Sequence, residues 1–360
     1  MKKWEIGPFK KVGRPIFEPD GASSFDCPFE GEDTRWEFSN VYNPACIIKD
    51  GKLHFFYRAD GKPLGGNDVF GNKKVVCRIG HAVSEDGISF ERYPEPVLYP
   101  EKEFEEFEWW GGCSDPHIVE GEDGRYYMNY DTWTGHYKRD GSGFGKSSSK
   151  EWEDVLMCAS SDDLVHWKKH GPALNDKWKS YYNHSRSGCV ICREVGDKLV
   201  AAKINGKYYM YATHEGYLLS SDDLIKWDVE LDDKGEPRKL FEKGNDSGYD
   251  AISHEAGACA LLTDDGIVYF YNAYGAVPGC EHLRDGGMFW TLSQALIDPN
   301  DLTKVVDKLD HPFLIPEYDF EMYGHSARAC VVCNSLVKWN GKWRLYYGCS
   351  DHVISLAIEE

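Results

Sequence analysis

The chain has 360 residues, long enough for two average domains or for one large all-β domain. It contains 22 tyrosines and 12 tryptophans, a composition that favours β-structure and surfaces on which sugar rings stack. Its formal net charge of -19 argues against nucleic acids and anionic membranes as partners, because phosphate-binding surfaces need an excess of basic residues.

The amino terminus carries no recognisable export signal. The segment MKKWEIGPFKK has no apolar stretch after its lysines, and no apolar run in the chain approaches the ~18 residues of a membrane span. The twelve cysteines are scattered rather than arranged as a disulfide framework. We therefore expect reduced thiols and a cytoplasmic location, with a clipped export signal as the alternative.

Two Cys-x-x-Cys pairs lie in strand-like contexts, GCVIC and ACVVCNSLV. Residues i and i+3 of a strand point to opposite faces, so neither Cys189 and Cys192 nor Cys330 and Cys333 can chelate one ion there. We predict that these cysteines are buried structural residues. Because the other metal-binding patterns are also missing, we expect no metal and no cofactor.

One turn signal recurs five times along the chain, each time before an aromatic-rich segment. In chain order these segments are residues 52–59 (KLHFFYRA), 125–133 (RYYMNYDTW), 207–216 (KYYMYATHEG), 267–275 (IVYFYNAYG) and 342–351 (KWRLYYGCSD). The preceding turns are Asp50-Gly51, Asp123-Gly124, Asn205-Gly206, Asp265-Gly266 and Asn340-Gly341. Such dipeptides between apolar runs predict type I′ hairpin turns, in which both residues have positive φ.

A second repeat follows three of the hairpins, at residues 84–90, 161–167 and 221–227. In each, a serine lies six residues before an aromatic residue, a pattern that predicts a turn into an outer strand. Five hairpin units with few helical stretches predict an all-β, five-bladed β-propeller, a single domain over residues 1–360. A pair of β-sandwiches would not explain the five-fold repeat. The polar segment 136–150 is interpreted as a mobile insertion that would cover one face as a lid.

Polar residues stand where the aromatic segments end, and a propeller would bring these ends to one funnel. They are Arg58, Asp131, Glu215, Asn272 and Asp351. The alternative is that they are solvated loop residues. The adjacent Trp109 and Trp110 would face opposite ways on a strand, so at most one would contact a sugar.

Three acidic residues have apolar or glycine-rich neighbours in sequence: Asp115 in GGCSDPHIV, Glu215 in YATHEGYLL and Glu255 in ISHEAGACALL. Glycoside cleavage commonly uses two carboxylates. Apolar surroundings raise the pKa of a carboxyl group, so that it can stay protonated and act as an acid. Pro116 would bias Asp115 to an extended backbone. For Asp115 the alternative is a turn cap.

Several motifs in this order resemble glycoside hydrolase family 130, from about residue 40 to the carboxyl terminus. They include VYNPACIIKDGKLHFFYRAD, RIGHAVSEDGISFER, GGCSDPHIV, AAKINGKYYMY and RLYYGCSDHVISLA. Members of this family are five-bladed propellers that split β-mannosides by phosphorolysis or hydrolysis. The resemblance implies that Asp115 is the general acid, acting through a sugar hydroxyl. It also implies that Asn43, Arg58 and Arg78 hold the non-reducing mannosyl unit and that Lys203 matches a phosphate-binding lysine.

The chain departs from the family pattern around the predicted acid and around the phosphate site. Ser114 and His117 replace a glutamate and an arginine, and Asn272 stands where phosphorylases have a histidine. Val155-Leu156 occupies the place of a phosphorylase arginine.

Glu215 and Glu255 fall where hydrolytic members place the glutamates that activate water. We therefore predict an inverting, exo-acting β-mannosidase for β-1,2-linked oligosaccharides, with Asn272 and Asp351 among the substrate-binding residues. One alternative is a mannoside phosphorylase that uses Lys203 with His117 or Arg186. Another is a non-catalytic carbohydrate-binding propeller.

Overall fold

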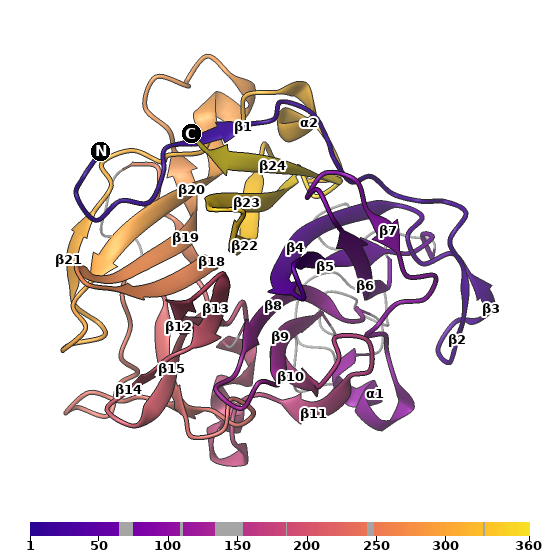
Figure 1. The fold of residues 1–360 in the computed structure, drawn as a ribbon, viewed down its shortest axis with the longest axis horizontal. Coiled ribbons are helices and arrows are strands. Elements are labelled where there is room, and N and C mark those ends of the chain that lie inside the picture. The colour runs from indigo at the N-terminus through magenta and orange to yellow at the C-terminus, as the bar shows by residue number, and fades with distance from the viewer. Residues whose placement is uncertain (65–74, 109–110, 134–153, 185, 243–247, 327) are drawn as a thin grey trace, which may run out of the picture.

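The structure is a computed structural model that describes residues 1–64, 75–108, 111–133, 154–184, 186–242, 248–326 and 328–360. Its regular secondary structure is mostly β-strand with a few short helices, so the all-β prediction is confirmed (Figure 1). No helix among these residues is long and apolar enough to cross a membrane.

The strands form five successive antiparallel units. Unit 1 contains β4 (Asn40–Lys49), β5 (Lys52–Asp60), β6 (Cys77–Ser84) and β7 (Glu91–Arg92). Unit 2 contains β8 (Ser114–Glu120), β9 (Tyr126–Trp133), β10 (Asp154–Ser161) and β11 (Lys168–Pro172). Unit 3 contains β12 (Cys189–Val195), β13 (Lys198–Ala201), β14 (Lys203–Ile204), β15 (Lys207–Ala212), β16 (Tyr217–Ser221) and β17 (Asp228–Val229).

Unit 4 contains β18 (Ser253–Thr263), β19 (Gly266–Ala276), β20 (Met288–Ile297) and β21 (Val305–Lys308). Unit 5 contains β22 (Val331–Trp339), β23 (Lys342–Cys349), β24 (Val353–Glu359) and the amino-terminal β1 (Phe9–Lys11). A hairpin of β2 (Phe25–Cys27) and β3 (Gly31–Thr34) stands apart. The short helices are η1 (Lys102–Phe104), α1 (Glu105–Glu108), η2 (Asp176–His184), η3 (Arg284–Gly287) and α2 (Asp319–Met322).

The five units lie around a common centre, toward which the first strand of each unit is turned (Figure 1). Neighbouring first strands are in contact from β4 through β8, β12, β18 and β22, and β22 returns to contact β4. β1 pairs antiparallel with β24, so residues from both ends of the chain complete unit 5. The ring of units positions the beginnings of five strands close together.

The predicted hairpin turns occur in all five units, but only three have the expected backbone. Asp50-Gly51, Asn205-Gly206 and Asn340-Gly341 have positive φ at both residues, as type I′ turns require. At Asp123-Gly124 and Asp265-Gly266 only the glycine has positive φ. The first of these two lies in a longer loop, between the end of β8 at Glu120 and the start of β9 at Tyr126, so its strands do not constrain both turn residues.

The serine turns are confirmed as one repeated structure before β7, β11 and β17. Oγ of Ser84 accepts a hydrogen bond from the amide of Gly87 at 2.8 Å. Ser161 and Ser221 accept the equivalent bonds from the amides three residues later, those of Leu164 at 2.8 Å and Leu224 at 3.0 Å. Each hydroxyl therefore satisfies a backbone donor that the turn would otherwise leave unpaired.

The first strands of four units carry a β-bulge near their start. The pairing register shifts between Tyr42 and Ala45 in β4 and between Ser114 and His117 in β8. Comparable shifts occur in β18 and β22. A bulge re-aims side chains and bends the strand, which here occurs beside the centre of the ring.

The prediction that the cysteines are buried structural residues is confirmed, because all twelve are free and buried. Cys189 and Cys192 of β12 pack into two different hydrophobic clusters, as side chains on opposite faces of a strand must. Among the residues that the structure describes, no three His, Cys, Asp or Glu side chains are grouped so that they could hold a metal ion.

Candidate active site

Asp115 lies in the bulge at the start of β8 and is only 3% exposed. Its Oδ1 accepts a hydrogen bond from Asn43 Nδ2 at 2.7 Å, and Arg58 donates to both carboxylate oxygens at 3.3 and 3.4 Å. The extended backbone expected from Pro116 is wrong, because φ of Asp115 is +49°. The bulge overrides the proline preference, and the resulting strain is typical of functional sites.

Asn43 repeats the geometry of Asp115 one unit earlier. It also precedes a proline, lies in the bulge of β4 and has a φ of +46°. Its Oδ1 is buried without a hydrogen-bond partner among the described residues, although its amide nitrogen binds Asp115. The pair therefore presents an unused acceptor beside the carboxylate, suited to a hydroxyl of a ligand.

Arg186 lies just before β12 and contacts four carboxylates, three from unit 2 and one from unit 4. Its nitrogens lie 3.1 Å from Glu255 and 3.2 Å from Asp154, and 3.7 Å and 3.8 Å from Asp115 and Asp131. These acids come from β18, β10, β8 and β9. A planar guanidinium is suited to such an arrangement because its donors form a fixed fork.

Ser187 contacts two of the same carboxylates, one through its backbone amide and one through its hydroxyl. Its amide donates to Asp131 at 3.0 Å, and its hydroxyl lies 2.8 Å from Glu255. Its φ of +50° directs the amide and the hydroxyl to these two acids from a single residue. Gly188 follows, and an added Cβ there would meet Met210 Sδ at 2.8 Å.

The crowding of carboxylates perturbs their ionisation. Burial is the main cause that raises the pKa of Asp154 to about 6; Arg186 opposes this rise, and the charges of Asp115 and Glu255 contribute to it. Burial and the neighbouring Asp154 raise the pKa of Asp131 well above its usual range. Burial would lower the pKa of Arg186, but the surrounding carboxylates outweigh burial and raise it.

Arg58 forms the other positive side of the site. Its guanidinium lies over the Tyr42 ring at 4.4 Å, and its Nε donates to Asp60 Oδ1 at 3.1 Å. Burial would raise the pKa of Asp60, but Arg58 and hydrogen bonds from Asn40 and Cys77 lower it. Asp60 therefore fixes the arginine that contacts Asp115.

Asp351 lies beside this group with a φ of +52°. Its Oδ1 is 3.6 Å from Cys330 Sγ, and burial raises its pKa while the nearby Arg58 opposes that shift. The structure thus brings Asp351 and Arg58 together with Asn43 and Asp115, as convergence at a funnel predicts. Their roles in binding a sugar stay predictions.

The apolar surroundings expected for the candidate acids are wrong for Asp115 and Glu255. Glu255 has 8% of its surface exposed, yet its carboxylate meets Arg186 and Ser187. The apolar residues that flank these acids in sequence point away from them, because neighbouring residues of a strand face opposite sides.

Within the described chain, the side chains of Glu215 and Asn272 form no hydrogen bond or ion pair with the other candidate site residues, although the sequence predicts that they converge with them. Glu215 follows β15 in a turn, and its carboxylate adds to the effect of burial in raising the pKa of Tyr217. Asn272 donates to the Ala256 carbonyl at 3.3 Å and accepts from the Cys333 amide at 2.9 Å. Asn272 therefore joins β19 to β22, and within the described chain no contact links Glu215 to Asp115.

The predicted ligands Arg78 and Lys203 lie outside this cluster. Arg78 is fully buried, where it pairs with Glu30 and donates to the Val76 carbonyl at 3.0 Å. Lys203 is exposed beside the Asn205-Gly206 turn, with its Nζ 4.8 Å from the ring of Tyr208. The proposed binding roles of both residues stay predictions.

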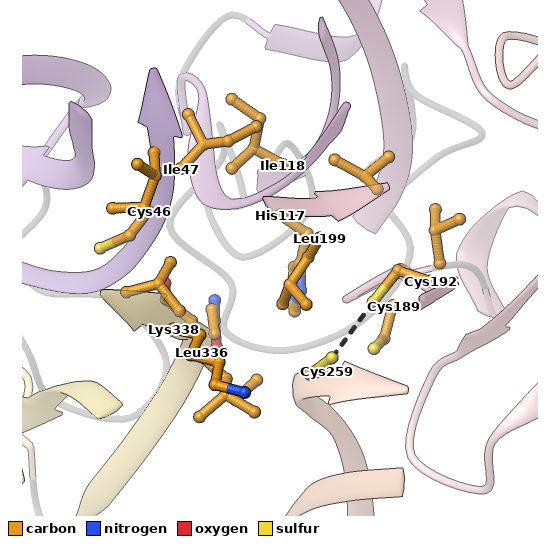
Figure 2. A pocket seen from close by; sticks show the side chains of 18 of the residues that line it. Cys46, Ile47, His117, Ile118, Cys189, Cys192, Leu199, Cys259, Leu336 and Lys338 are labelled. Atoms are coloured by element: carbon orange, nitrogen blue, oxygen red, sulfur yellow. Dashed lines mark hydrogen bonds between the residues drawn. The ribbon is translucent and has the colours of Figure 1, made fainter. Parts of the chain in front are cut away.

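A cavity at the centre of the ring is lined by residues from all five first strands (Figure 2). His117 and Cys46 are among the residues that line it, and the thiols of Cys192 and Cys259 lie 3.3 Å apart in its wall. Its volume of about 50 Å³ has room for a few water molecules but not for a sugar ring. Burial lowers the pKa of His117 to about 4, so this histidine is neutral at pH 7.

Sequence reasoning did not identify Asp154, Ser187 or Asp60 as site residues. Asp154 is an acid immediately before the apolar run VLMCA, a weak signal shared by other acids in the chain. The predicted lid at 136–150, Trp109 and Trp110 lie outside the described residues.

Comparisons with known proteins agree with this architecture. Residues 10–360 match the model of glycoside hydrolase family 130, which is described as beta-1,4-mannooligosaccharide phosphorylase. The chain belongs to glycoside hydrolase family 130. A 1,2-beta-oligomannan phosphorylase of Thermoanaerobacter sp. (strain X514) is 30% identical over 333 residues, 91% of this chain and 92% of the relative.

A second family 130 relative, a beta-1,2-mannobiose phosphorylase of the same organism, is 29% identical over 91% of this chain and 93% of the relative. A solved structure is 32% identical with a TM-score of 0.86, covering 99% of this chain and 95% of the other. Its description reads "The GH130 family of mannoside phosphorylases contains glycoside hydrolases that target beta-1,2 mannosidic linkages in Candida mannan". The two named relatives favour the phosphorylase alternative over hydrolysis.

Proposed function

We propose that this family 130 chain hydrolyses β-1,2-linked manno-oligosaccharides from the non-reducing end with inversion of configuration. The observation that carries the proposal is the pairing of Asp115 and Glu255 on one guanidinium, that of Arg186. Two carboxylates that contact one guanidinium at these distances lie within about 10 Å of each other. Inverting glycosidases separate their acid and base by about 6.5–9.5 Å, which leaves room for a water molecule.

In this mechanism Asp115 gives its proton to the glycosidic oxygen, through a sugar hydroxyl as the family resemblance implies. Glu255 takes a proton from water while the water oxygen attacks the anomeric carbon and the bond to the leaving sugar breaks. Asn43 and Arg58 hold Asp115 and offer polar atoms to the sugar in the site. Glu215 remains a second candidate for the base.

We further propose that the five units form a five-bladed β-propeller in a single domain. The closed ring of first-strand contacts and the pairing of β1 with β24 support this architecture. The substrate would enter at the ends of the strands that carry Asp115, Glu255 and Arg58.

The charge of the site supports water as the acceptor. Within the described chain, the cations that contact Asp115 are Arg58 and Arg186, and both are already paired with carboxylates. His117 is neutral at pH 7, and Lys203 is at the turn end of its strands. A phosphate dianion would meet several carboxylates and few uncommitted cations.

Phosphorolysis is the second candidate because both named relatives are phosphorylases. In that reaction phosphate would replace water as the nucleophile and Arg186 would have to exchange carboxylate partners for it. The product would be mannose 1-phosphate instead of mannose.

The test incubates purified protein with β-1,2-mannobiose and longer homologues, with and without about 10 mM inorganic phosphate. We expect mannose at equal rates in both conditions. Phosphate-dependent formation of mannose 1-phosphate would establish phosphorolysis instead. Binding without turnover in either condition would support the non-catalytic alternative.

A further inference from the structure

Each of the three guanidinium nitrogens of Arg186 lies near a carboxylate. Asp154, at the start of β10, contacts one terminal nitrogen of the guanidinium at 3.2 Å, and Asp131 of β9 lies 3.8 Å from Nε. Nε also lies 3.1 Å from Glu255, and the other terminal nitrogen lies 3.7 Å from Asp115. Asp154 and Asp131 therefore hold the arginine, which also contacts the two proposed catalytic acids.

We propose that Arg186 is a positioning residue that holds Glu255 in place relative to Asp115, and that Asp154 anchors Arg186 in that position. This inference rests on the proposed function, in which Glu255 is the base. Neither residue needs to contact the reacting atoms. Their influence is electrostatic and geometric.

The buried setting makes this influence strong. Arg186 has 19% of its side chain exposed and Asp154 15%, so bulk water screens their charges only weakly. An arginine within hydrogen-bonding distance lowers the pKa of a carboxyl group by about 1–3 units, and an added carboxylate raises it. Asp154 is ionised only above its pKa of about 6, so in the acidic range the neighbouring charge on Glu255 is that of Arg186.

The pH dependence of kcat/KM separates this role from a merely structural one. In Arg186→Gln, Glu255 loses its cation while Asp115, Asp131 and Asp154 remain, so the acidic limb should move up by about one pH unit. Asp154 is protonated below its pKa of about 6, so Asp154→Asn should leave the acidic limb in place and lower kcat above that pH, where the charged anchor of Arg186 is lost. Arg186→Lys keeps the charge and should restore part of the shift.

A matched control is Arg193→Gln, which removes an arginine of the same unit that pairs with Glu122 at 3.5 Å on the surface. Its profile should be unchanged. An acidic limb that does not move in Arg186→Gln, or a kcat of Asp154→Asn that stays at the wild-type value above the Asp154 pKa of about 6, would overturn the proposal. Should Arg186→Gln fail to fold, the kcat of Asp154→Asn above that pH decides alone.

Two further measurements keep this test independent of the proposed reaction. The product of the wild-type enzyme shows whether water or phosphate is the acceptor. Mannose 1-phosphate would refute hydrolysis, and the measurement without turnover would then judge Arg186. The ionisation of Glu255 is followed without turnover, from the carboxylate infrared band of each variant minus its Glu255→Gln form. An unshifted titration of Glu255 in Arg186→Gln would overturn the positioning role.

Discussion

Two short segments with nearly the same sequence differ sharply in their surroundings. His214-Glu215-Gly216 forms a turn after β15, whereas His254-Glu255 begins β18 and is followed by the bulge at Gly257. Glu255 meets Arg186 and Ser187 at the centre of the ring. Glu215 instead lies near Tyr217, in the turn between β15 and β16.

The histidines differ in the same way. His254 is stacked on Phe241 with a centroid distance of 4.1 Å and lies 3.6 Å from Asp250. It points to the opposite face of β18 from Glu255, because the two are adjacent on a strand. His214 bonds Ser253 at 2.7 Å. Position within a unit, more than local sequence, therefore decides what each segment can do.

The largest expected effect comes from Glu255→Gln. The amide keeps the size of the side chain but cannot accept a proton, so kcat should fall by about 10²–10⁴-fold with KM changed little. Steady-state kinetics on β-1,2-mannobiose measure this, with thermal unfolding as the control for folding. Retention of more than about a tenth of wild-type kcat would exclude Glu255 as the base, because loss of a general base lowers kcat by more than that.

The next effect tests how firmly the start of β18 is anchored. Asp250 accepts from Lys308 at 2.8 Å and from Tyr271 at 3.1 Å. Burial would raise the pKa of Asp250, but hydrogen bonds from His254 and Lys308 outweigh burial and lower it from 3.8 to about 2. Its contribution to stability is therefore present above pH 3.8 and lost as the pH falls through about 2.

Asp250→Asn should lower the free energy of unfolding at pH 7 by about 2 kcal/mol and flatten its decline between pH 4 and pH 2. Urea unfolding at a series of pH values measures both changes. An exposed acid that lacks these partners, Asp233, provides the matched control as Asp233→Asn. An acid decline as steep in Asp250→Asn as in wild type would contradict the anchoring role.

The smallest effect is expected for Glu215→Gln. With Glu255 as the base and Glu215 in an outer turn, kcat should change by less than about threefold, the scale of an indirect electrostatic effect. The same kinetic assay applies. A loss comparable with that of Glu255→Gln would show that the two glutamates act together and that the contrast between the segments is incomplete.

Much of the fold could be predicted from local patterns. Asn205-Gly206 and Ser161 each determine a turn through their own backbone or hydroxyl, so the sequence signal and the structure coincide. The two positive-φ prolyl junctions at Asn43 and Asp115 could not be predicted, because the bulges depend on the neighbouring strand. Asp154 could not be singled out among 60 acidic residues without knowing its partner.

By itself, the sequence determined the recurring hairpins, the serine turns and the motifs of family 130, since these depend on residues close together in the chain. Only the tertiary structure decided which acids share Arg186, because closure of the ring brings β8, β9, β10 and β18 to the residue that precedes β12. It also separated Glu255 from Glu215. The physical reason is that a carboxylate's chemistry depends on the charges and donors within a few ångströms, and those come from distant segments.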